Sequence, residues 1–231
     1  MWSTALTILT VLISYHLGAA QELNESSAES KIRLLITGHE DIAPPVFGPD
    51  EVWYALKGQG GQWALTIVKP TAISETPMVG LEGTRISAEA VDEGSFLIAG
   101  VPNFREGPVT ASISSRQVLY PGQTASVLYS YSLEAEGTAM GAQYGGGMVF
   151  LDYAFWLRNN QRRELLVMKS RMSSENPPSV EWAGDLDHDD VPDFILNVPQ
   201  GDVGAHFILF LSSMANGSLV SPVAIWDVHG C

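Results

Sequence analysis

From Ile32 onwards, the chain alternates apolar runs of strand length with short clusters of glycine, proline and asparagine. Runs of this length bounded by turn residues are typical of β-strands. Two of them, Val52–Leu56 and Trp63–Val68, flank the turn sequence Gly58–Gly61 and predict a hairpin. No stretch shows a helical period with end caps. The pattern predicts an all-β fold of mainly antiparallel, sandwich-like sheets.

The middle of the chain continues this pattern. Phe96–Val101 reads as a short buried strand, and Pro121-Gly122 is a turn pair between two longer runs. Thr124–Ala135 alternates apolar and polar side chains, which predicts a single half-buried strand. Its apolar face would carry Val127, Tyr129, Tyr131 and Leu133. Met148–Leu157 and Arg163–Lys169 predict another hairpin.

The C-terminal part predicts a β-meander. Its strands are Phe194–Val198, Ala205–Ser212 and Leu219–Val228, and Asn216-Gly217 is a favoured turn pair. We divide the chain into a signal peptide (1–20), a mobile polar leader (21–30), an N-terminal β region (31–140) and a C-terminal β region (141–231).

The most informative local sequence is an acidic loop that precedes this meander. It places aspartates at loop positions 1, 3, 5 and 9, namely Asp185, Asp187, Asp189 and Asp193. Ca²⁺ takes about 6–8 oxygen ligands, largely from carboxylates and backbone carbonyls. The spacing predicts one Ca²⁺ site with these four side chains and the Val191 carbonyl as ligands. The alternative is a solvated acidic turn without an ion.

The loop Gly184-Asp185-Leu186-Asp187-His188-Asp189-Asp190-Val191-Pro192-Asp193-Phe194 resembles the calcium loop of FG-GAP and VCBS-type repeats, as in integrin α-subunit propellers. The resemblance covers residues 181–197 and implies the same ion. Asp190 replaces the family's sixth-position glycine, where φ is usually positive; whether it ligates the ion is left open. A propeller is not favoured, because no second Asp-x-Asp-x-Asp run occurs.

The N-terminus predicts export. An apolar core, Ala5–Ile13, precedes Gly18-Ala19-Ala20, which suits cleavage before Gln21. A membrane anchor is the weaker alternative, because a span needs about 20 apolar residues. Removing the signal leaves 231 − 20 = 211 residues, and no further transmembrane span is expected. We expect a protein that is secreted or located in the periplasm or cell envelope, and whether it is free or envelope-associated is left open.

Charge and cysteine content restrict the partners. The signal contains no charged residue, so the mature chain keeps a formal net charge of 12 − 26 = −14. Nucleic acid is therefore not an expected partner, because phosphate binding relies on clustered Lys and Arg. Cys231 is the only cysteine, which excludes an intrachain disulfide.

Three functions fit the sequence. The first is a non-catalytic exported module with one structural Ca²⁺ and an unknown protein or glycan ligand. The second is a calcium-dependent adhesion protein, by analogy with the integrin-type loop. The third is an envelope polysaccharide hydrolase, for which the many tryptophans and acidic residues are the best sequence support. The chain shows no nucleophile elbow or Cys-x-x-Cys pair.

Overall fold

The computed structural model describes residues 32–38, 40–41, 45–75, 83–141, 147–200 and 204–229. The predicted signal peptide, the leader and Cys231 lie outside this part of the chain, so those predictions stay untested. The described residues form strands and turns without a helix, which confirms the all-β prediction. No helix with the length and hydropathy of a membrane span occurs among them.

One large antiparallel sheet organises the molecule. Its strands, in spatial order, are β1 (Arg33–Ile36), β7 (Phe96–Ala99), β3 (Trp53–Gln59), β4 (Gln62–Val68), β8 (Gly107–Ile113), β14 (Ser179–Asp185), β15 (Asp193–Gln200), β16 (Gly204–Leu211) and β17 (Ser221–His229), with β9 (Gln117–Val118) paired to β14. The two edge strands, β1 and β17, lie in contact with each other. The sheet therefore curls until it nearly closes.

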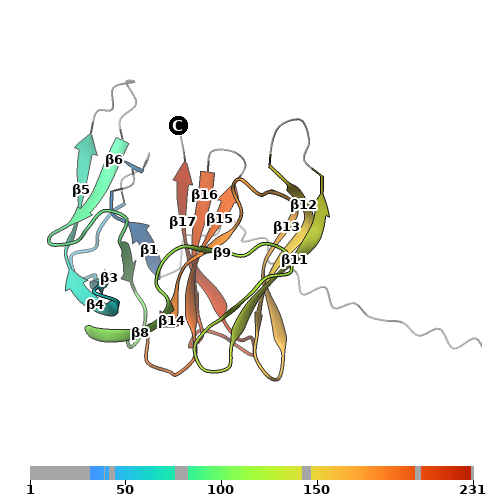
Figure 1. The fold of residues 1–231 in the computed structure, drawn as a ribbon. Helices are drawn as coiled ribbons and strands as arrows, with labels where there is room; N and C mark the ends of the chain where they lie inside the picture. Colours follow the sequence, from blue (N-terminus) through green and yellow to red (C-terminus); the bar gives the residue numbers. More distant parts are fainter. Residues whose placement is uncertain are drawn as a thin grey trace, which may run out of the picture.

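Two smaller antiparallel sheets flank the large one. The four-stranded sheet contains β10 (Thr124–Ser126), β11 (Ser132–Met140), β12 (Val149–Arg158) and β13 (Arg163–Ser173); the three-stranded sheet contains β2 (Glu40–Asp41), β6 (Gly83–Ala88) and β5 (Pro70–Glu75). Figure 1 shows β5 and β6 on one side of the molecule, β15–β17 in the middle and β11–β13 on the other side.

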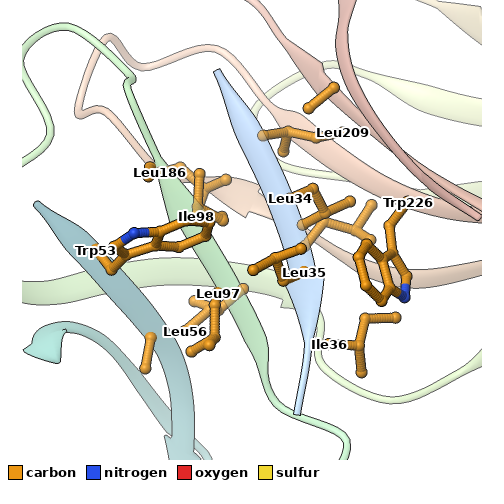
Figure 2. Packing of buried hydrophobic residues seen from close by; sticks show 14 of the residues in the cluster. Leu34, Leu35, Ile36, Trp53, Leu56, Leu97, Ile98, Leu186, Leu209 and Trp226 are labelled. Atoms are coloured by element: carbon orange, nitrogen blue, oxygen red, sulfur yellow. The ribbon is translucent and has the colours of Figure 1, made fainter. Parts of the chain in front are cut away.

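Two hydrophobic cores hold these sheets together. The first fills the inside of the curl and includes Trp53, Leu209 and Trp226. Figure 2 shows Leu34, Leu35 and Ile36 of β1 between Trp53 and Trp226. The second core lies between the four-stranded sheet and β14–β16, and this pair of sheets confirms the predicted sandwich-like packing.

Strand β15 contributes to both cores. Ile195 lies in the first core, whereas Phe194 and Leu196 lie in the second. Successive side chains of a strand point to opposite faces, and here both faces are covered. This explains the nearly continuous apolar sequence Phe194–Leu196, since neither face of the strand meets water.

Several predicted elements are confirmed. β3 pairs with β4 around the glycine turn, β12 pairs with β13, and β15, β16 and β17 form the C-terminal meander.

The turn predicted at Asn216-Gly217 differs from the structure. Asn216 and Gly217 lie in a longer connection between β16 and β17 and do not form a two-residue turn. The large sheet takes strands from both regions, 31–140 and 141–231.

The prediction of a single strand over Thr124–Ala135 is wrong. The segment folds back on itself as β10 and β11, with Ser126 opposite Ser132. Tyr129 stands in the turn with a φ of 62°, so it does not share a strand face with Leu133. The alternation misled because a hairpin keeps apolar residues on one face of both arms, and this turn contains no glycine or proline to mark it.

Candidate metal centre

The acidic loop connects β14 to β15 at the end of their ladder. Gly184 pairs with Asp193 on one side and with Ala111 of β8 on the other. A Cβ atom at Gly184 would lie 2.2 Å from the Thr110 carbonyl oxygen, so only glycine fits between these strands. The close packing fixes the backbone from which Asp185 projects.

The fold brings three of the predicted ligands together. Asp185, Asp187 and Asp193 each offer a carboxylate oxygen, and these oxygens all lie within 4.8 Å of one another. Asp193 is fully buried and Asp185 is 4% exposed, whereas Asp187 is partly exposed. The cluster therefore combines two buried carboxylates with one that is partly open to solvent.

Neutral donors hold the two buried carboxylates. The Leu186 N–H donates to Asp193 Oδ2 at 2.8 Å, and the Ser212 N–H donates to Asp193 Oδ1 at 2.8 Å. Asp185 accepts from the N–H groups of Asp189 and Asp190, each at 3.2 Å. Backbone N–H groups thus orient the carboxylates without neutralising their charge.

The cluster has more acceptor oxygens than protons to share. The Ser212 hydroxyl lies 2.9 Å from Asp189 Oδ2 and 3.0 Å from Asp193 Oδ1, but a hydroxyl donates only one proton. The Ser213 hydroxyl donates to Asp187 Oδ2. Asp187 Oδ1 is buried and has no hydrogen-bond partner among the described residues. A cation would satisfy these oxygens, and their hard donor character fits one.

Burial and mutual repulsion perturb the carboxylates. Burial raises the pKa of Asp193 well above its usual range, and the charge of Asp187 raises it further, although hydrogen bonds from Ser212 and Leu186 oppose the shift. Burial also raises the pKa of Asp187, with smaller upward contributions from Asp189 and Asp185. Without a cation, the folded protein therefore favours a proton in this cluster.

The other predicted ligands occupy the rim. Asp189 Oδ1 accepts from the Val191 N–H at 2.9 Å, so its carboxylate bends back over the loop. The Val191 carbonyl stays a predicted ligand. Asp190 has a φ of 64°, the conformation expected at the sixth position. Its side chain accepts a hydrogen bond from the Tyr129 hydroxyl at 3.0 Å.

Sequence reasoning missed Ser212, Ser213 and Tyr129. The two serines directly follow β16, and Tyr129 lies in the turn between β10 and β11. No spacing in the sequence links them to the acidic loop, because the register of β15 against β16 and the packing of the two sheets bring them there. The adjacent Ser212-Ser213 pair at a strand end was the only available signal.

No protein-family model, curated protein or solved structure matches the chain. The resemblance of the loop to FG-GAP and VCBS-type repeats therefore stays a prediction based on residues 181–197.

Proposed function

We propose that the chain is an exported, non-catalytic β protein that holds one structural Ca²⁺ and serves as an extracellular or envelope binding module. The observation that supports ion binding is the buried Oδ1 atom of Asp187, which has no hydrogen-bond partner among the described residues and lies beside two buried carboxylates. Export rests on the predicted signal sequence. The positive φ of Asp190 supports the further proposal that the loop is of the FG-GAP type.

The donor atoms favour calcium over other common metals. All three clustered groups are carboxylates, whereas Zn²⁺ prefers cysteine sulfur and histidine nitrogen. Mg²⁺ requires nearly ideal octahedral geometry and keeps several waters, while Ca²⁺ accepts flexible oxygen shells. The partly exposed Asp187 and the exposed Asp189 leave one side of the cluster accessible to water, which fits the more permissive ion.

The position of the cluster supports a structural role. Leu186 is fully buried in the first core, and Ser212 ties the loop to the end of β16. An ion bound here would hold the β14–β15 connection against β16. Extracellular modules bind Ca²⁺ with a Kd of about 10⁻⁴–10⁻³ M, which suits an ion that stabilises a fold.

The test is a thermal melt of the protein with calcium and with excess EDTA. We expect calcium to raise the melting temperature of the wild type, and we expect Asp187→Ala to abolish the increase. Asp50→Ala is the matched control, because Asp50 is an exposed carboxylate outside the loop. An equal calcium response in the wild type and Asp187→Ala would reject the ion site.

A further inference from the structure

The four-stranded sheet ends at a long strand that has a neighbouring strand on one side only. β13 spans Arg163–Ser173 and, among the described strands, pairs with β12 alone. The β16–β17 connection covers its start, where Arg162 Nη1 donates to the Gly217 carbonyl at 2.6 Å. Beyond this contact, no described strand pairs with the outer side of β13. The outward backbone N–H and C=O groups of such an edge are open to pairing with another chain.

The length and sequence of β13 suit such pairing. Natural edge strands are commonly short, interrupted by proline or protected by a charged side chain that points inward. β13 has 11 residues and contains no proline. Met168 is 54% exposed on it, and the inward charge is that of Lys169.

Lys169 lies on the inner face of this edge. It is directly opposite Tyr153, which is fully buried in the second core, and directly paired residues share a sheet face. Lys169 is partly buried, and this burial lowers the pKa of its ammonium group. Among the described residues it makes no ion pair or hydrogen bond. A partly buried charge without a partner is unfavourable, so a carboxylate on an added strand would be stabilising here.

The distribution of charge also favours an acidic partner. Residues 158–171 contain five Lys and Arg residues and one acid, Glu164, which gives 5 − 1 = +4, whereas the rest of the chain carries 7 − 25 = −18. Glu134 forms ion pairs with Arg158 and Arg163, but no described carboxylate neutralises Lys169. Opposite charges across an interface guide and orient a partner.

The second core is incompletely covered beside this edge. Ile208 of β16 is 8% exposed, but Ile225, its direct partner on β17, is 37% exposed. The covering sheet therefore ends above β16. Contact between the start of β13 and the β16–β17 connection places the outer edge of β13 on the same side. A strand added to β13 would extend the cover towards Ile225, where an apolar side chain fits.

We propose that the outer edge of β13 binds an extended acidic segment of a partner protein as an additional strand of this sheet. Backbone hydrogen bonds would hold the segment, and its inward side chains would supply specificity. A carboxylate would pair with Lys169, and an apolar side chain would contact Ile225. The inference rests on the proposed binding role and names a partner class for it, but the ion takes no part.

The experiment measures binding of synthetic peptides to the intact protein by isothermal titration calorimetry. Each peptide alternates valine and threonine, and its central valine is replaced by glutamate, glutamine or lysine. We expect the glutamate peptide to bind saturably and at least about tenfold more tightly than the lysine peptide. No saturable binding of the glutamate peptide, or equally tight binding of the lysine peptide, would overturn the proposal.

A fourth peptide tests the backbone pairing. It repeats the glutamate sequence with N-methylated backbone amides, which cannot donate hydrogen bonds. We expect its binding to be lost, because strand addition depends on main-chain hydrogen bonds. Equal binding of the methylated and unmethylated peptides would exclude an added strand.

Two variants locate the site. Lys169→Glu reverses the charge at the edge, and we expect it to bind the lysine peptide at least about tenfold more tightly than the glutamate peptide. Lys69→Glu is the matched control, because exposed Lys69 directly precedes β5, and β5 and β13 lie on opposite sides of the molecule (Figure 1). It should keep the wild-type preference. An unchanged preference in Lys169→Glu would refute the assignment.

Sedimentation of the protein without peptide tests the other possible occupant, a second copy of this chain. We expect a monomer. A dimer that Lys169→Glu dissociates would assign the edge to a second copy and overturn the proposal.

A measurement in excess EDTA separates this site from the ion site. We expect peptide binding to be unchanged there, so that failure of the calcium proposal would leave the peptide result standing. Loss of peptide binding in EDTA would contradict the independence of the two sites.

Discussion

Replacing Asp187 by asparagine is expected to stabilise the ion-free protein and to remove its response to calcium. The substitution keeps the side-chain shape and an acceptor oxygen for Ser213, which donates to Asp187 Oδ2. It removes one charge from a cluster whose oxygens lie within 4.8 Å of one another. The added amide N–H₂ group would also give the crowded carboxylates a donor.

The magnitude follows from the geometry. Two unit charges about 4.8 Å apart repel by roughly 3.5 kcal/mol at an effective dielectric of about 20. Partial protonation and solvent on the open side of Asp187 reduce this cost, so we expect a gain of about 1–3 kcal/mol in EDTA. For a chain of this size, that gain corresponds to a rise in melting temperature of roughly 2–12 °C.

Calcium should narrow the difference between the melting temperatures of the wild type and Asp187→Asn, or reverse their order. At about 1 mM Ca²⁺ and a Kd near 10⁻⁴ M, mass action adds roughly 1.4 kcal/mol to the wild type, or roughly 3–6 °C. Asp187→Asn should lose most of this increase. The assay is differential scanning calorimetry in EDTA and in calcium, with Asp50→Asn as control. A variant that melts below the wild type in EDTA and keeps the full calcium response would refute the reasoning.

Three further predictions concern the same region. The pKa values of Asp187 and Asp193 are raised in the folded state, so without calcium the folded protein binds more protons than the unfolded chain, and its stability falls as pH rises through those values. The melting temperature in EDTA should therefore rise on acidification from neutral pH. The increase in melting temperature caused by calcium should disappear near pH 4. The hydrogen bond to Asp190 raises the pKa of Tyr129, so Asp190→Ala should lower the pKa of that phenol, measured as the difference between ultraviolet titrations with and without Tyr129→Phe. Gly184→Ala places a Cβ 2.2 Å from a backbone oxygen and should cost about 3 kcal/mol or more, seen as a lower urea midpoint; an unchanged midpoint would contradict the packing described.

Local patterns predicted most of the strands correctly. The hairpin of β3 and β4 and the meander of β15–β17 follow from apolar runs between turn residues, and these signals act over a few residues. The turn at Tyr129 was missed because no turn residue of this kind marks it in the sequence. No local sequence pattern marks a tyrosine with a positive φ. Tyr129 in this conformation makes a hydrogen bond to Asp190, which belongs to the loop of another sheet.

The candidate site likewise has one part that the sequence predicted and another that it did not. The sequence by itself determined the extended strands and the spacing of Asp185, Asp187 and Asp193, because strand period and loop spacing are short-range properties. Only the tertiary structure decided that Ser212 joins the carboxylates, that both faces of β15 are buried, and that Lys169 lies at the edge of the four-stranded sheet. Burial and charge proximity depend on segments distant in sequence, and such contacts form only when the strands pair and the sheets pack.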